Sequence, residues 1–147
     1  MENIQEKILM QIVYEGFELS ETPIEGKKAI GIWVNGVIFF DEAPRKMGYS
    51  SAKKYCRNFR KSKPYPSLGT KSDWKMLFKR GRTLGMFNSL CETVGLKPID
   101  FDTPYWFEQN PKNCYLAFGV DRRLWSVSLE IHPLYCVRPV MPYPLDK

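Results

Sequence analysis

The stretch AIGIWVNGVIFF, residues 29–40, decides the fold class. It contains two runs rich in β-branched and aromatic residues, which are typical of strands. The pair Asn35-Gly36 joins them, and both residue types readily adopt the positive φ angles of the type I′ turn that suits a β-hairpin. The sequence therefore predicts a β-hairpin over residues 29–40.

Three helices are predicted after this hairpin. The first has apolar side chains at i, i+3, i+4 and i+7 from Ala52, with basic side chains largely on its other side. The second follows Thr70, which forms a capping box with Asp73 three residues later. The third covers residues 83–94 and ends at Gly95.

Short apolar runs replace helical spacing from residue 103 onward and predict three or four short strands. The order of hairpin, helices and strands favours an α+β domain over residues 27–147, whose terminal strands share a mixed or antiparallel sheet. Residues 1–26 are expected to form an N-terminal extension packed on this domain. Helical spacing favours a helix over residues 3–13, although the β-branched stretch at residues 12–14 also suits a strand.

The composition indicates one folded domain. The chain has 147 residues, of which 44% are hydrophobic and 14% aromatic, enough for a sizeable core. No apolar run approaches the ~20 residues that span a bilayer, and the acidic, amphipathic start does not resemble a signal peptide. We therefore expect no membrane span and a cytoplasmic location for the chain as written. An extracellular or virion-associated location would require an upstream leader.

The net charge of +6 is unevenly distributed along the chain. Residues 1–26 carry six Glu and one Lys, a sum of −5, whereas residues 53–82 carry eleven Lys or Arg and one Asp, a sum of +10. Such a basic segment indicates either a surface for nucleic acid or acidic glycans, or the solvated faces of two helices. The candidate anion-binding residues are Lys53, Lys54, Arg57, Arg60 and Lys61.

The residues that most often carry catalysis or bind metals are sparse. A single histidine, His132, excludes a multi-histidine metal site. No nucleophile elbow, phosphate loop or His-carboxylate pair is present, so we expect neither an enzyme nor a cofactor. The cysteines lack the close spacing of zinc or redox motifs, which favours buried, reduced thiols and no metal. They are Cys56, Cys91, Cys114 and Cys136.

Two groups of side chains near the chain end invite separate interpretations. Arg138, between Val137 and Pro139, is expected to pair with a buried carboxylate or with carbonyls. Arg122 and Arg123 follow Asp121 in a predicted turn, where two adjacent guanidinium groups could clasp an acidic ligand.

Three consecutive aromatic residues, Tyr105, Trp106 and Phe107, follow the helices. Side chains alternate across a strand, so at least one of the three is expected to be exposed or to cover a loop. An exposed ring there would suit stacking on a protein or sugar. A second small core beneath the long loop is the open alternative.

Several short motifs resemble, in their order, those of a bacterial group of C-type-lectin-like domains, many from gut Bacteroidetes and most of unknown function. The pattern runs from the hairpin through A-x-x-x-C, T-x-x-x-W-x-x-L, a helix around an asparagine followed by a glycine, and a Tyr-Trp pair to a closing V-R-P-V. The matching residues are Ala52, Cys56, Thr70, Trp74, Leu77, Asn88, Leu90, Gly95, Tyr105, Trp106, Tyr115, Phe118, Val137, Arg138, Pro139 and Val140.

This resemblance covers residues 29–140 and implies a C-type-lectin-like fold, in which loops between the later strands carry binding. It also implies that Cys56 and Cys136 are near neighbours, which would be bonded in an oxidising compartment. The calcium-binding tripeptides of that superfamily, Glu-Pro-Asn or Gln-Pro-Asp followed by Trp-Asn-Asp, are absent here. Binding is therefore expected to be independent of calcium.

The leading hypothesis is a non-enzymatic binding or structural module that recognises a protein or glycan partner through the loop region of residues 105–126. The alternative is anion or nucleic-acid binding through residues 53–82. The candidate ligand-binding residues of the loop region are Tyr105, Trp106, Phe107, Asn110, Asn113, Arg122 and Arg123.

Overall fold

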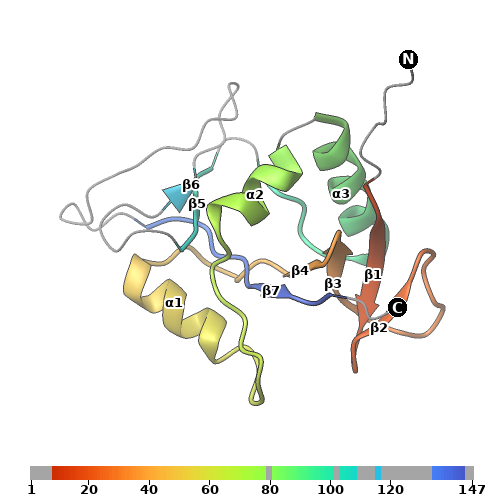
Figure 1. The fold of residues 1–147 in the computed structure, drawn as a ribbon, viewed down its shortest axis with the longest axis horizontal. Helices are drawn as coiled ribbons and strands as arrows, with labels where there is room; N and C mark the ends of the chain where they lie inside the picture. Colours follow the sequence, from red (N-terminus) through yellow and green to blue (C-terminus); the bar gives the residue numbers. More distant parts are fainter. Residues whose placement is uncertain (1–7, 79–80, 101–102, 109–114, 117–133, 145–147) are drawn as a thin grey trace.

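The fold is α+β, with a five-stranded antiparallel sheet in the order β2-β1-β3-β4-β7 (Figure 1). The computed structural model describes residues 8–78, 81–100, 103–108, 115–116 and 134–144. The strands of this sheet are β1 (Met10–Tyr14), β2 (Glu18–Ser20), β3 (Ala29–Val34), β4 (Val37–Phe40) and β7 (Val140–Pro142). A second, two-stranded sheet pairs β5 (Tyr105–Trp106) with β6 (Tyr115–Leu116).

The predicted hairpin is confirmed as β3 and β4. Asn35 and Gly36 have φ angles of 44° and 97°, as the turn requires. The turn is also fixed to the neighbouring strand, because Leu9 N donates a hydrogen bond to Asn35 Oδ1 over 2.8 Å. The closing strand β7 pairs with β4, so the hairpin and the chain end share one antiparallel sheet, as expected.

The predicted N-terminal helix is wrong within the described residues, because Met10–Tyr14 is strand β1 at the interior of the sheet. Ile12 packs in the apolar cluster on one face of the sheet, whereas Val13 packs in the cluster on the other. A strand can bury two consecutive apolar residues on opposite faces. Two segments of residues 1–26, β1 and β2, are therefore strands of the sheet itself.

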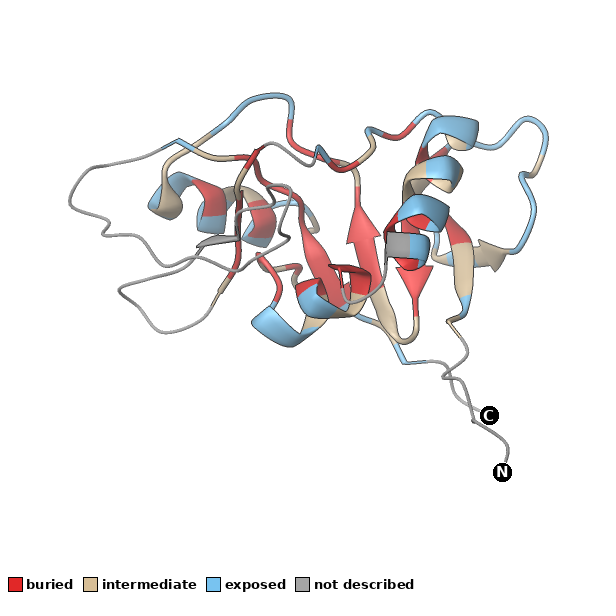
Figure 2. Ribbon diagram, turned by 90° about the horizontal axis from the view of Figure 1, so that it is seen from above, coloured by how far each residue is buried: buried red, intermediate tan, exposed pale blue. Residues whose placement is uncertain are grey.

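Two helices, α2 (Lys71–Phe78) and α3 (Gly81–Val94), pack their apolar sides on one face of the sheet (Figure 2). The capping box at the start of α2 is confirmed: Thr70 N donates to Asp73 Oδ2 over 2.9 Å, and Asp73 N donates to Thr70 Oγ1 over 3.2 Å. Gly95, with φ 82°, follows the end of α3 as predicted. No helix among the described residues is both long and apolar enough to cross a membrane.

The remaining helix, α1 (Tyr49–Arg57), packs on a separate small cluster. Its Ala52 and Cys56 are buried there against Leu68, Trp106 and Val137. In Figure 1, α1 lies at one end of the molecule, opposite the β1–β2 hairpin. This placement leaves the outer side of α1 open to solvent.

A pair of glycine substitutions tests the packing of the sheet. A Cβ at Gly31 would lie 2.8 Å from Phe39 O and 3.1 Å from Phe40 Cα, both backbone atoms of β4. Gly31→Ala should therefore lower the free energy of unfolding by about 1–3 kcal/mol. A Cβ at Gly85, within α3, would meet nothing within 4 Å. Gly85→Ala should raise the free energy of unfolding by about 0.5–1 kcal/mol.

Urea titrations followed by circular dichroism measure both changes. A Gly31→Ala protein as stable as the unmodified chain would contradict the close approach of β3 and β4 at this position.

Candidate functional site

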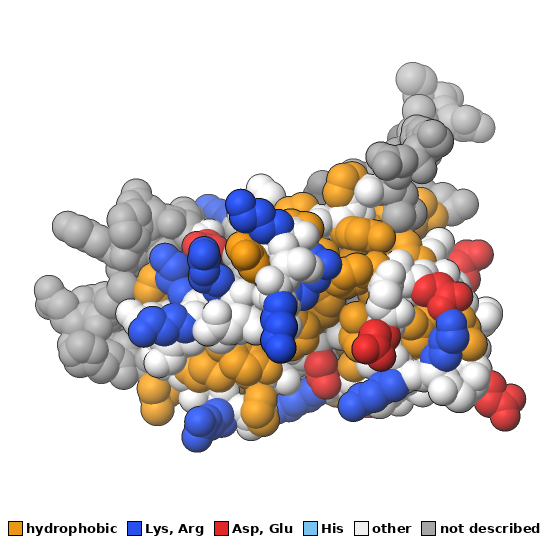
Figure 3. All heavy atoms as spheres, turned by 90° about the horizontal axis from the view of Figure 1, so that it is seen from below, with side chains coloured by type: hydrophobic (Ala, Val, Ile, Leu, Met, Phe, Trp, Pro, Cys, Tyr) orange, Lys and Arg blue, Asp and Glu red, His pale blue; other side chains and the backbone are white. Residues whose placement is uncertain are grey.

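The outer side of α1 and the turn after it form a basic face, consisting of Lys53, Lys54, Arg57, Arg60 and Lys61. The helix turns Ala52 and Cys56 into the protein, so its basic residues are left outside. Arg60 is half-buried and the other four are exposed. In Figure 3, Lys and Arg side chains gather toward the α1 end of the molecule, while Asp and Glu concentrate toward the other end.

The basic face keeps most of its positive charge uncompensated. Among the described residues, its one ion pair joins Lys53 Nζ to Glu108 Oε1 at 3.9 Å, and both side chains are well exposed. Such exposed pairs contribute little binding or stability. Arg60 Nη1 instead donates to the carbonyl of Pro64 over 2.9 Å, which ties the turn after α1 to the following loop.

Aromatic rings underlie the cations of this face. Each of three cations lies over a half-buried ring, a geometry that is worth roughly 0.5–1 kcal/mol at exposed sites. The pairs, with the distance from the cation to the ring centroid, are Lys53–Tyr49 (5.4 Å), Arg57–Tyr65 (5.0 Å) and Arg60–Phe17 (4.5 Å).

One further ring, Phe59, borders the same face and is 37% exposed. It packs against Phe40 of β4 with the ring centroids 4.9 Å apart, and against Tyr55 at 6.1 Å. Phe59 lies between Arg57 and Arg60 in the chain, and Tyr65 follows Lys63, so two rings lie among the cations of the segment from Arg57 to Tyr65. The face therefore offers both charge and aromatic surface.

The aromatic residues predicted for the loop site are buried. Tyr105 and Trp106 are fully inaccessible and Phe107 is 3% exposed, so none of the three presents an exposed ring. Tyr105 and Phe107 enter the main core, whereas Trp106 points to the other side and packs in the small cluster under α1. Both sides of this segment are covered by apolar residues, as the alternative of a second small core requires.

The other predicted residues of the loop site lie outside the described residues. They are Asn110, Asn113, Arg122 and Arg123, and the same holds for His132 and Cys114. Among the described residues, no group of three His, Cys, Asp or Glu side chains could hold a metal ion.

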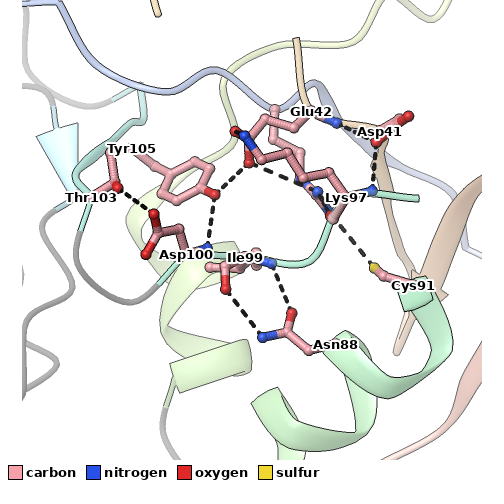
Figure 4. Close-up of polar contacts among 10 residues, drawn as sticks. Asp41, Glu42, Asn88, Cys91, Lys97, Ile99, Asp100, Thr103 and Tyr105 are labelled. Carbon is pink, nitrogen blue, oxygen red and sulfur yellow. Dashed lines mark hydrogen bonds and ion pairs between the residues drawn. The ribbon is translucent and has the colours of Figure 1, made fainter. Parts of the chain in front are cut away.

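A buried polar cluster, which the sequence did not reveal as a unit, joins four distant segments (Figure 4). Glu42, just after β4, is at its centre. Its Oε2 lies 3.0 Å from Lys97 Nζ, and its Oε1 accepts a hydrogen bond from Tyr105 Oη. Glu42 Oε1 also lies 3.9 Å from Arg138 Nη2. The buried Glu42 carboxylate thus faces two cations, the buried Arg138 guanidinium and the largely exposed Lys97 ammonium.

Arg138 is fully buried and confirms the predicted pairing with a carboxylate and a carbonyl. Its Nη2 donates to the carbonyl of Lys97, and its Nη1 donates to Cys91 Sγ over 3.9 Å. The guanidinium also lies 5.4 Å from the ring centroid of Phe87. Burying a charge costs several kcal/mol unless it is paired, so these contacts are needed for the chain end to pack here.

Side chains of neighbouring segments hold the backbone around this cluster. Asp41 Oδ1 accepts hydrogen bonds from Glu42 N over 2.9 Å and from Lys97 N over 3.0 Å. Asn88 of α3 binds both backbone groups of Ile99, accepting over 2.8 Å and donating over 3.1 Å. The segment after α3 is therefore held in place by side chains from two other elements.

The cluster suits a structural role better than proton transfer. Burial raises the pKa of the Tyr105 phenol, and the Glu42 carboxylate raises it further, so Tyr105 stays protonated. The hydrogen bond and charge of Glu42 raise the pKa of Lys97, which keeps its ammonium charged. Neither group is poised to exchange a proton near neutral pH.

Three buried thiols, Cys56, Cys91 and Cys136, are free in the structure. Burial, followed by the nearby Glu42 carboxylate, raises the pKa of the Cys136 thiol to about 12. Burial also raises the pKa of Cys56 and of Cys91, the latter despite the nearby Arg138 guanidinium. Cys56 and Cys136 are not bonded, and they belong to different apolar clusters.

Comparisons with known proteins do not assign a function to the basic face or to the polar cluster. No protein-family model, curated protein or solved structure matches the chain. Function is therefore inferred from charge, exposure and contacts.

Two Glu→Gln substitutions test the importance of the buried cluster. Glu42→Gln should lower the free energy of unfolding by about 3 kcal/mol, because it leaves the Arg138 guanidinium buried without a counter-charge. Glu18→Gln makes the same chemical change in the exposed ion pair with Lys27 and should cost less than about 1 kcal/mol. Urea titration measures both. Equal effects of the two substitutions would contradict the assigned role of Glu42.

Thiol labelling tests the burial of the cysteines. At pH 8 the native protein should leave Cys56, Cys91 and Cys136 unlabelled by iodoacetamide, because the thiolate is the reactive form and burial raises each pKa. Labelling of Cys136 should increase only as the pH rises toward 12. Non-reducing peptide mapping, after labelling in urea, provides the control and reports any Cys56–Cys136 bond. Rapid labelling of native Cys136 at pH 8 would contradict its burial.

Proposed function

We propose that the protein is a non-enzymatic binding module that holds polyanions, nucleic acids or acidic glycans, on the basic face. The observation that supports this proposal is the positive charge on α1 and the turn after it. Lys53, Lys54, Arg57 and Lys61 are exposed there, Arg60 of the same turn is half-buried, and one acidic side chain among the described residues pairs with this face. Charges that merely keep a surface soluble are usually interspersed with charges of the opposite sign. This face lacks that mixture.

Counterion release provides the driving force for such binding. A cation that neutralises a phosphate frees the counterions condensed on the nucleic acid, so affinity falls steeply as salt rises. The cation–π contacts reduce the cost of ordering long side chains, because Arg57 and Arg60 are already held over rings. The guanidinium groups of Arg57 and Arg60 are thus preorganised before a polyanion binds.

The proposed fold is the C-type-lectin-like arrangement. The shared sheet of β3, β4 and β7 supports it. A backbone hydrogen bond between two segments about 30 residues apart also supports it: Trp106 N donates to the carbonyl of Cys136 over 3.1 Å. An experimental structure in which residues 140–142 paired with a strand other than β4 would contradict this arrangement.

Recognition of a protein or glycan through residues 105–126 stays a prediction. Tyr105, Trp106 and Phe107 of that region are buried and cannot stack on a ligand in this conformation. The basic face is therefore the better supported binding surface.

Heparin chromatography tests the basic face with a matched control. Replacing Lys53, Lys54, Arg57 and Lys61 by Gln should make the protein elute at much lower salt than the unmodified chain. The slope of log affinity against log salt, measured with a duplex DNA, should become shallower by about 3, because up to four phosphate contacts are lost.

The control variant removes four exposed cations that lie outside the basic face, Lys28, Lys71, Lys75 and Arg82. It has the same net charge as the first variant and should elute close to the unmodified protein. Equal losses in the two variants would show that net charge, rather than this face, causes retention. Failure of the unmodified protein to bind at ~50 mM salt would refute the proposal.

A further inference from the structure

We propose that the preferred ligand of the basic face is single-stranded nucleic acid, whose unpaired bases stack on the rings and guanidinium groups interleaved along it. This inference rests on the proposed polyanion-binding function and specifies its ligand class. It comes from a feature that charge alone does not explain, the presence of two partly exposed rings, Phe59 and Tyr65, among the cations.

Tyr65 and Phe59 are the rings that carry the argument. Tyr65 lies in the loop after α1, half-buried, with the Arg57 guanidinium 5.0 Å from its centroid. Phe59 is 37% exposed, although most phenylalanines of the described chain are buried. Base–aromatic stacking tolerates any sequence, and an arginine held over a ring provides a second stacking plane. The segment from Arg57 to Tyr65 thus combines charge with stacking platforms.

The arrangement of the cations suits a strand that follows the helix. Lys53 and Arg57 are one turn apart on α1, about 6 Å along its axis. Beyond the helix, Lys61 and Lys63 continue the exposed positive charge past Phe59. A flexible single strand can follow such a line of cations while its bases turn toward the rings, as in other positively charged grooves with stacking residues.

Duplex DNA and acidic glycans would use only part of this face. In a duplex the base faces are stacked on one another, so a protein reaches only base edges and phosphates. The half-buried rings of this face would then contribute little. Acidic glycans can pair with the cations but offer no aromatic base to the rings. A single-stranded nucleic acid can use both the cations, through its phosphates, and the rings, through its unpaired bases.

Fluorescence anisotropy with two oligomers of equal charge tests this inference. One is a thymidylate oligonucleotide of about 16 nucleotides, near the largest site that one small binding face covers. The other is an abasic deoxyribose-phosphate oligomer of the same length. The unmodified protein should bind thymidylate about tenfold more tightly than the abasic oligomer, since only the former has bases to stack.

Ring variants identify the stacking residues. Tyr65→Leu and Phe59→Leu keep apolar volume but remove the ring, and each should weaken thymidylate binding about tenfold while leaving abasic and heparin binding unchanged. Tyr65→Phe keeps the ring and should bind like the unmodified protein. Met86→Ala, which truncates an exposed apolar side chain of α3, is the control and should change nothing. Thermal unfolding checks that each variant folds, and the Tyr65 variants decide the test if Phe59→Leu does not.

The outcomes separate this inference from the proposed function. Equal binding of the two oligomers, with heparin binding intact, would overturn single-strand preference and leave polyanion binding standing. Loss of binding in both Tyr65→Leu and Tyr65→Phe would overturn stacking in favour of a hydroxyl contact. Binding to phosphatidylserine vesicles that Phe59→Leu abolishes, without any effect on thymidylate, would assign the ring to a membrane surface and overturn the inference. Failure to bind any polyanion would refute the proposed function itself.

Discussion

Arg138, buried next to Glu42, joins the closing strand to two distant segments of the chain. A guanidinium that is fully removed from water requires a counter-charge and hydrogen-bond acceptors, at a cost of several kcal/mol if they are missing. Its partners come from the ends of β4 and α3, far from the chain end in sequence. The closing strand is therefore packed in its place only where these segments supply the partners of Arg138. The pairing of Val140 with Phe39 follows two residues later along the chain.

Residues next to Arg138 and Tyr105 in the chain form the surface on which α1 packs. Val137, directly before Arg138, and Trp106, directly after Tyr105, form much of the small cluster on which α1 packs. Trp106 Nε1 also donates to the carbonyl of Met47 over 2.7 Å, which anchors the segment leading into α1. Once this surface exists, the apolar side of the helix docks on it, and the basic side faces water. The exposed cations are thus oriented by a buried pair of opposite charges.

The features that could be predicted from the sequence are those whose cause is local. The Asn35-Gly36 turn, the Thr70–Asp73 capping box and the helical spacing of the basic face each depend on residues a few positions apart. The sequence left helix and strand open at Ile12, because its apolar spacing suits either one and the neighbouring strands decide the outcome. The burial of Trp106 was missed because its cover is α1, about 50 residues earlier. Glu42 carries no local signal, since its partners are Lys97, Tyr105 and Arg138.

The distribution of charge in space says more about binding than the net charge of +6. Arg138 is one of the 22 basic residues, yet it is buried next to the Glu42 carboxylate and contributes no cation to the surface. The described glutamates of the first 26 residues are exposed on or near the β1–β2 hairpin, at the end of the molecule opposite α1 (Figures 1 and 3). Separated charges of this kind create a dipole, which attracts a polyanion toward α1 and repels it from the hairpin. Added salt screens both effects over a Debye length of about 8–10 Å, so orientation and affinity should weaken together.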